Sequence, residues 1–142
     1  RDASKSRGLG DVYKRQLWDK LAQLAQVAAL TTLARLPMEA AMQDLLLFDV
    51  GKRVLQEIAA VARARKVAID PALVEAKLAL AATYPPKLYA SMYHDLVAGK
   101  KIEVEGIFGY VSKAGQRCAI PTPTIDLVYA FLRPHANGQV VA

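Results

Sequence analysis

Hydrophobic positions recur at helical spacing along most of the chain. Apolar side chains at three- and four-residue intervals predict a first helix from Leu17 to about Arg35–Pro37 and a long second helix from about Leu45 to Lys66. The charged residues of the second helix, Glu57 among them, are expected mostly to face water. Its apolar stripe is expected to be buried and consists of Val50, Val54, Leu55, Ile58, Val61 and Ala62.

Shorter helices follow, and Gly and Pro residues mark their limits. Asp70-Pro71 is a favourable start, because Asp can cap free amides and Pro at the first helical position loses no useful donor. The expected ranges are about 70–85, 88–98, 103–114 and 121–133. Residues from His135 onward are expected to be a frayed or truncated end. With no strand–helix alternation and no Gly-rich phosphate loop, the sequence predicts one all-α domain over residues 17–134.

The first sixteen residues have no apolar period and are rich in Arg, Lys, Ser and Gly. Residues 11–16, Asp-Val-Tyr-Lys-Arg-Gln, resemble one reading frame of a transposon-end sequencing adapter. We interpret Arg1–Gln16 as a sequencing-adapter or assembly scar, expected to be disordered. A genuine basic arm is the alternative.

The charge of the chain does not change the predicted class of protein once residues 1–16 are set apart. The net charge is +6 at pH 7, and residues 1–16 supply half of it. No basic stripe with interleaved aromatic residues occurs, so the sequence does not favour a nucleic-acid partner. A nucleic-acid binder would lose its affinity steeply with salt, and lose it altogether when residues 1–16 are removed.

Localisation and metal binding rest on few residues. Cys118 is the only cysteine, so no internal disulfide can form and a reducing cytoplasm is the default compartment. Polar residues interrupt the apolar segment 25–30 at helical intervals, which argues against a signal or membrane segment. Neither of the two histidines has a partner at metal-ligand spacing, so no metal site is predicted. The tyrosines are expected to pack with their hydroxyls in water.

Three short motifs carry candidate chemistry, and they occur in a fixed order. The first is Trp18-Asp19-Lys20-Leu21, near the start of the first helix. The second is Ser91-Met92-Tyr93-His94-Asp95, whose first and last residues share one face of a helix. The third is Ile102-Glu103-Val104-Glu105, which places Glu103 twelve residues after Ser91.

Together these motifs resemble the C-terminal domain of ketopantoate reductases (2-dehydropantoate 2-reductases) over about residues 17–133. That family carries Trp-x-Lys-Leu/Phe, Ser-Met-x-x-Asp and Thr-Glu-Ile-Asp at these places. The resemblance implies a helical domain of the 6-phosphogluconate dehydrogenase C-terminal type, with its N-terminal Rossmann domain missing. It implies the substrate-side half of an NADPH-dependent 2-oxo acid reductase, inactive alone, that pairs with the Rossmann half and in some cases with a second copy.

The resemblance also implies a role for each motif residue. Hydride delivered to a 2-oxo carbon builds negative charge on oxygen, which an ammonium can stabilise before it gives up a proton. Lys20 stands at the family's proton-donating lysine, Ser91 at its substrate-binding serine, and Glu103 at its cofactor-side carboxylate.

One departure concerns the substrate. The family places asparagines four and eight residues after the lysine, where this chain has Leu24 and Ala28. Gln23 is one step round the helix and is a candidate substrate-binding replacement, with plain solvent exposure as its alternative. Losing an amide that pairs with substrate would change which 2-oxo acid is accepted. The sequence therefore favours a paralogue with an altered substrate.

A different interpretation stays open, in which the chain is a stand-alone helical dimerisation or interaction module without catalysis. In that case Lys20, Ser91 and Glu103 would lie apart, separated by packed core. A shared cavity and hydrogen-bond distances among them would favour the enzyme.

Overall fold

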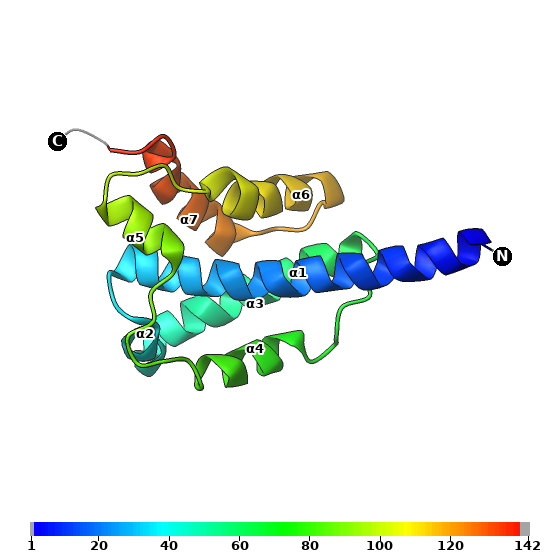
Figure 1. Ribbon diagram of the computed structural model, residues 1–142, viewed down its shortest axis with the longest axis horizontal. Coiled ribbons are helices and arrows are strands. Elements are labelled where there is room, and N and C mark those ends of the chain that lie inside the picture. Colours follow the sequence, from blue (N-terminus) through cyan, green and yellow to red (C-terminus); the bar gives the residue numbers. More distant parts are fainter. Residues whose placement is uncertain (1, 140–142) are drawn as a thin grey trace.

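The computed structural model describes residues 2–139, and these residues form helices and no strand (Figure 1). The predicted all-α fold class is confirmed. The elements are α1 (Asp2–Ala34), α2 (Met38–Gln43), α3 (Leu45–Ala64), α4 (Leu73–Ala81), α5 (Ser91–Val97), the π-helical turn η1 (Glu105–Gly109), α6 (Tyr110–Cys118), α7 (Pro123–Leu132) and the 3₁₀ turn η2 (Arg133–His135).

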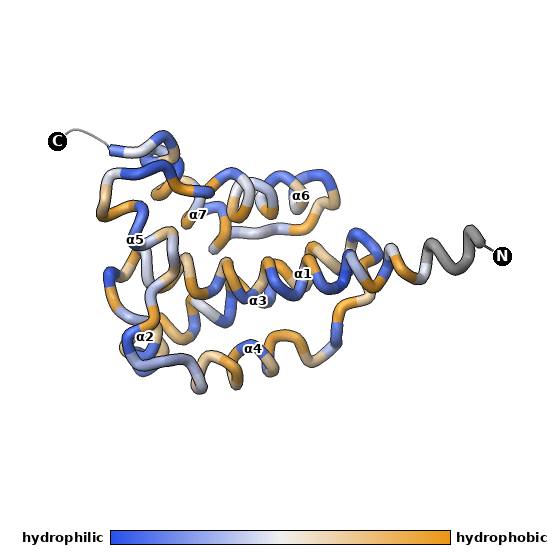
Figure 2. The backbone as a smooth tube through the Cα atoms, in the orientation of Figure 1, coloured by the Kyte–Doolittle hydropathy of each residue, from blue (hydrophilic) through white to orange (hydrophobic). Residues whose placement is uncertain are grey.

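Helices α1 and α3 pack along each other and form the centre of the domain (Figure 1). Helix α4 covers one side of this pair, and α6 and α7 cover the other. Helices α2 and α5 lie near the C-terminal end of α1. In Figure 2 the hydrophobic stretches of α1 and α3 run through the interior, as their periodicity predicts.

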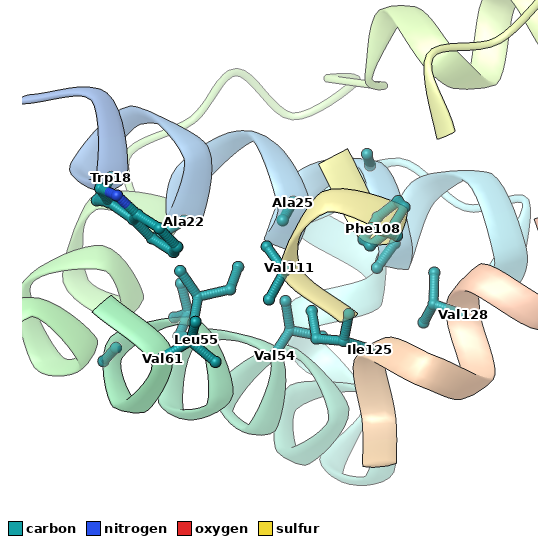
Figure 3. Close-up of a cluster of buried hydrophobic side chains, with 14 of the residues drawn as sticks. Trp18, Ala22, Ala25, Val54, Leu55, Val61, Phe108, Val111, Ile125 and Val128 are labelled. Carbon is teal, nitrogen blue, oxygen red and sulfur yellow. The ribbon is translucent and has the colours of Figure 1, made fainter. Parts of the chain in front are cut away.

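The main core lies between α1, α3, η1, α6 and α7 (Figure 3). Helix α1 contributes Trp18 and then small residues, Ala22 and Ala25, which let its backbone approach α3 closely. Phe108 of η1 fills the space beyond them and is fully buried. The predicted stripe of α3 is buried as expected, except for the half-buried Val50.

Helix α1 begins well before the predicted start at Leu17. Residues 2–16 continue the same helix, which differs from their expected disorder. From Gly8 to Leu17 no residue is buried, and Trp18 is the first to enter the core. Adding residues to a helix that is already packed avoids the cost of nucleation, so the extension needs no tertiary contact. The origin of residues 1–16 as a scar stays a prediction.

Several boundaries differ from the sequence prediction. Helix α2 was not predicted, and it is short enough to carry no clear period. Helix α5 starts at Ser91 because Ala90 before it is extended. Helix α4 ends at Ala81, ahead of the two prolines expected to stop it.

The end of the chain is attached to the domain as far as the structure describes it. The Ile102 amide donates to the Ala136 carbonyl at 3.2 Å, and the Gln139 amide donates to the Gly99 carbonyl at 2.9 Å. Residues 135–139 therefore differ from the frayed end that was expected. Residues 140–142 of that predicted tail lie outside the described residues.

Glu57 does not face water as expected. Its carboxylate accepts the backbone amides of Thr124 at 3.0 Å and Ile125 at 2.9 Å. These amides lie in the first turn of α7, where no intrahelical carbonyl can receive them. Glu57 therefore caps α7 from α3 and fixes the angle at which α7 joins the core.

We expect Glu57→Ala to lower the free energy of unfolding by about 1–2 kcal/mol, because the Thr124 and Ile125 amides lose a charged hydrogen-bond acceptor. The matched control is Gln56→Ala, one residue earlier on α3 and exposed. Denaturant unfolding followed by circular dichroism measures both variants. Equal losses in the two would contradict the capping role.

Candidate active site

A cavity of about 280 Å³ lies between α1, the segment 84–92 and η1. Two of the predicted site residues, Gln23 and Ser91, line it, although they are far apart in the sequence. Leu24 and Ala28, the residues at the family's asparagine positions, line the same cavity. The part of the first helix that follows its Trp-x-Lys motif and the start of the Ser-Met-x-x-Asp motif therefore meet at one site.

Lys20 and Glu103 are exposed and do not line this cavity. Lys20 lies one helical turn before Leu24, and Glu103 lies two residues before the start of η1, which carries the lining residue Ile107. A Cβ at Gly106 would lie 3.1 Å from the Glu103 carboxyl carbon, so this carboxyl folds back over the first turn. Among the described residues no hydrogen bond or ion pair joins Lys20 to Glu103.

The Gln23 side chain is held by a buried lysine of α4. Lys77 Nζ donates to Gln23 Oε1 at 3.2 Å and to Asp19 Oδ2 at 2.7 Å. The NH₂ group of Gln23 is a donor, and its neighbour in the cavity wall is the Tyr84 hydroxyl. Sequence analysis missed Lys77, although it falls on the buried side of α4 beside Val74 and Ala81, a spacing at which a lysine is unusual.

Tyr84 also lines the cavity, and its hydroxyl is buried. Burial raises the pKa of Tyr84, and the neighbouring Gln23 amide opposes the shift in part. No hydrogen bond of good geometry to this hydroxyl is recorded among the described residues. The expectation that the tyrosine hydroxyls are wet is therefore wrong for Tyr84, because segment 84–90 folds onto α1 and α2.

A second polar cluster lies on the outer side of η1. The Tyr129 hydroxyl donates to Glu105, with its oxygen 2.7 and 2.8 Å from the two carboxylate oxygens, and Lys113 Nζ lies 3.4 Å from one of them. The Tyr129 hydrogen bond lowers the pKa of Glu105, with help from Lys113. Gly109 makes this contact possible, since a Cβ there would lie 2.8 Å from Glu105 Oε1.

We expect Tyr129→Phe to raise the pKa of Glu105 towards its ordinary value, because the main stabilising donor is lost. A depressed carboxyl pKa adds stability above the unfolded-state pKa, and this is lost as the pH falls through the folded-state value. In the variant the folded-state pKa of Glu105 lies closer to the unfolded-state pKa. The free energy of unfolding should therefore fall less as the pH is lowered through this range. Carbon-detected NMR titration measures the pKa, with Tyr110→Phe as control, since Tyr110 hydrogen-bonds Arg65 instead. An unchanged Glu105 titration would contradict the assignment.

Residues 2–139 contain no group of three or more His, Cys, Asp or Glu side chains placed to hold a metal ion. No helix of this part of the chain is both long enough and apolar enough to cross a membrane.

Comparison with known proteins places the chain in a family. Residues 13–136 match the family model described as "Ketopantoate reductase PanE/ApbA C terminal". The match begins inside the segment interpreted as a scar and includes all four candidate site residues.

Solved structures of ketopantoate reductases have the same fold. A dimeric ketopantoate reductase from Staphylococcus aureus superposes with a TM-score of 0.81 at 25% identity, covering 86% of this chain and 43% of that one. A PanE/ApbA family ketopantoate reductase from Ralstonia eutropha JMP134 gives 0.79 at 28%, covering 86% and 41%. D-mandelate dehydrogenase, in a ternary structure with NADH and anilino(oxo)acetate, gives 0.76 at 21% over 86% and 51%, a likeness of fold alone.

The chain spans less than half the length of these two ketopantoate reductases. Its helices correspond to their C-terminal domain, as the family match shows. The chain belongs to the ketopantoate reductase family and comprises that family's C-terminal domain.

Proposed function

We propose that this chain is the substrate-binding and catalytic half of an NADPH-dependent 2-oxo acid reductase, acting in pantothenate biosynthesis or as a paralogue with another substrate. One observation carries the proposal: Gln23 and Ser91, predicted separately from distant parts of the sequence, line one cavity. The rest of the proposal comprises a cytoplasmic location, a Rossmann domain as the other half, and a second copy as a partner of the kind described for the Staphylococcus aureus enzyme.

In this proposal Lys20 is the general acid. Its ammonium stabilises the charge that develops on the 2-oxo oxygen and then gives up a proton to it. NADPH, when bound, supplies the hydride. Lys20 is exposed in this chain, so the domain that holds the cofactor would also exclude water from the ammonium and strengthen its effect.

The other residues position substrate and lysine. Ser91 and the NH₂ group of Gln23 can each donate a hydrogen bond to a substrate oxygen at the cavity. Glu103, on the exposed edge of the same region, would keep the ammonium charged and oriented once the two halves close. The described part of the chain has no sheet that could bind a dinucleotide. In this proposal Glu103 is the one residue of this domain assigned to the cofactor side.

The test joins this chain from residue 13 onward to the nucleotide-binding domain of the Ralstonia eutropha ketopantoate reductase, in place of that enzyme's own C-terminal domain. We expect the joined enzyme to oxidise NADPH when a 2-oxo acid is added, and the unjoined chain to show no turnover. Binding of NADPH, followed by its fluorescence, and cooperative thermal unfolding show that the joined protein is assembled. An assembled protein that reduces no 2-oxo acid would contradict the proposal, as would turnover by the unjoined chain.

The stand-alone interaction module is favoured by the lack of a hydrogen bond or ion pair between Lys20 and Glu103 among the described residues, and by one surface feature. An apolar groove of about 600 Å³ runs between α7 and the ends of α1 and α3, and Leu127 and Phe131 in its wall are 59% and 62% exposed. An interaction module would still bind its partner protein when Lys20 and Ser91 are replaced. If Lys20→Met abolishes 2-oxo acid reduction by the joined enzyme while the protein stays folded, the module without catalysis is excluded.

A further inference from the structure

Lys77 of α4 is a charged residue in a position where lysine is rare. Its side chain is only 9% exposed. Burying an ammonium costs free energy unless polar or charged groups replace the water that it loses. Asp19 Oδ2 at 2.7 Å and Gln23 Oε1 at 3.2 Å are these groups. Because the Asp19 side chain is 49% exposed, the ion pair alone does not account for a buried lysine.

The ammonium of Lys77 determines which way the Gln23 amide points. An ammonium can only donate, so the part of Gln23 that faces it must be the carbonyl oxygen. The NH₂ group then lies at the other end of the amide, where its neighbour is the Tyr84 hydroxyl. Without Lys77 the two ends of the amide could exchange places. The buried lysine therefore fixes a donor next to Tyr84.

This arrangement leaves the Tyr84 hydroxyl with a hydrogen to donate. An NH₂ group offers no acceptor, so the phenol oxygen can only accept from Gln23. The hydroxyl is buried, and no group within residues 2–139 accepts its hydrogen. Buried donors without an acceptor are rare in proteins, because nothing offsets the water that they lose. Such a hydroxyl is suited to a bound molecule that brings the acceptor.

Two cavities flank Tyr84, and its hydroxyl lies on the side of the one beside α1. Gln23, the neighbour of the hydroxyl, lines this cavity and does not line the other, which lies between α2 and α4. None of the described residues that line the cavity beside α1 carries a charge. Its volume of about 280 Å³ is below the usual range for drug-sized ligands, about 300–1,000 Å³. The cavity therefore suits a small molecule whose oxygen atoms accept hydrogen bonds.

We propose that Tyr84 is a binding residue of this cavity, and that its hydroxyl donates a hydrogen bond to a ketone or carboxylate oxygen of the bound molecule. Lys77 is a positioning residue, which acts through Gln23 and does not line the cavity itself. The inference rests on the proposed function for the identity of the ligand as a 2-oxo acid. The roles of Tyr84 and Lys77 come from the contacts described above.

The test uses the full 142-residue chain, with ¹³C at the tyrosine ring carbon that bears the hydroxyl, and 2-oxobutanoate as the probe. We expect the Tyr84 signal to shift when the acid is added and the Tyr93 signal to stay, since Tyr93 does not line the cavity. Tyr84→Phe should weaken binding about ten-fold through loss of one hydrogen bond, as measured from backbone amide signals.

Tyr93→Phe is the matched control, at a tyrosine that is half-buried like Tyr84. It should change the dissociation constant by less than about two-fold, because it removes a hydroxyl outside the cavity. No binding to the unchanged chain, no shift at Tyr84, or equal effects of the two variants would overturn the proposal.

Lys77→Met tests the positioning role, because it removes the ammonium and keeps the apolar stem. It should weaken binding about as much as Tyr84→Phe does, and the Tyr84 signal should no longer shift with the acid. Adding Lys77→Met to Tyr84→Phe should weaken binding no further, because both changes act through one hydroxyl. Lys87→Met, at an exposed lysine, removes the same charge and should leave binding within about two-fold. Losses that add in the double variant would contradict the positioning role.

The binding experiment needs no hydride transfer, so its failure can be told from failure of the proposed function. Binding that depends on Tyr84, without turnover in the joined enzyme, would remove the reaction and keep the assignment of Tyr84. Turnover in the joined enzyme with a KM that Tyr84→Phe leaves unchanged would keep the reaction and remove the assignment.

Discussion

Lys20→Met in the joined enzyme lowers kcat for 2-oxo acid reduction by about 10²- to 10⁴-fold, the range expected for loss of a general acid. Methionine keeps the length and apolar stem of the side chain and removes only the ammonium. Because Lys20 is exposed on α1, its replacement should not disturb the fold. Binding of the substrate and of NADPH should change little, so kcat falls far more than KM rises. Steady-state kinetics with a 2-oxo acid measures this split.

The control for this prediction is Lys52→Met on α3, where the lysine does not line the cavity. It should keep kcat within a factor of about two, since a single surface charge acts weakly at a distance. Similar losses in both variants would mean that charge in general, and not Lys20, supports turnover. Full activity of Lys20→Met would remove the general-acid assignment.

The second large effect is on stability, at Phe108. This side chain is 0% exposed and packs in the core at the π-helical turn (Figure 3). Phe108→Ala should lower the free energy of unfolding by about 3–5 kcal/mol, through lost burial and the cavity that remains. The turn also carries Ile107, so the cavity beside α1 should lose its shape along with the core.

The matched control is Phe131→Ala, at a phenylalanine of α7 that is 62% exposed. It should change stability by less than about 0.5 kcal/mol, as is usual for surface positions. Guanidinium unfolding at equal protein concentration compares the two variants. A loss at Phe131 as large as that at Phe108 would show that the apolar groove beside α7 is covered in solution, contrary to the exposure seen here.

Much of the fold follows from sequence periodicity alone. The limits of the long helix α3 and of the last helix α7 lie within two residues of the predicted ones, because their apolar stripes are continuous. For α7, prolines also mark both boundaries. Helix α2 was missed because six residues are too few to show a period. The π-helical turn was missed because its extra residue per turn depends on packing between Gly109 and α7, a contact between distant parts of the chain.

Part of the candidate site could likewise be predicted from the sequence, and part of it could not. Lys20, Ser91 and Glu103 came from the order of short motifs, and Gln23 came from its place beside a missing asparagine. Their roles stay predictions. Lys77, Tyr84 and Glu57 were not predicted as polar partners, because each acquires its environment from a helix or loop far away in the sequence.

The measurement that tests the central claim most directly is the fate of the hydride. The joined enzyme is incubated with a 2-oxo acid and with NADPH in which both hydrogens at C4 of the nicotinamide are deuterium, and the product is examined by proton and deuterium NMR. Our account predicts a 2-hydroxy acid with deuterium at C2, formed by the protein with Lys20 and lost in Lys20→Met. A product without deuterium at C2, or no product from a protein that binds both NADPH and the acid, would contradict it.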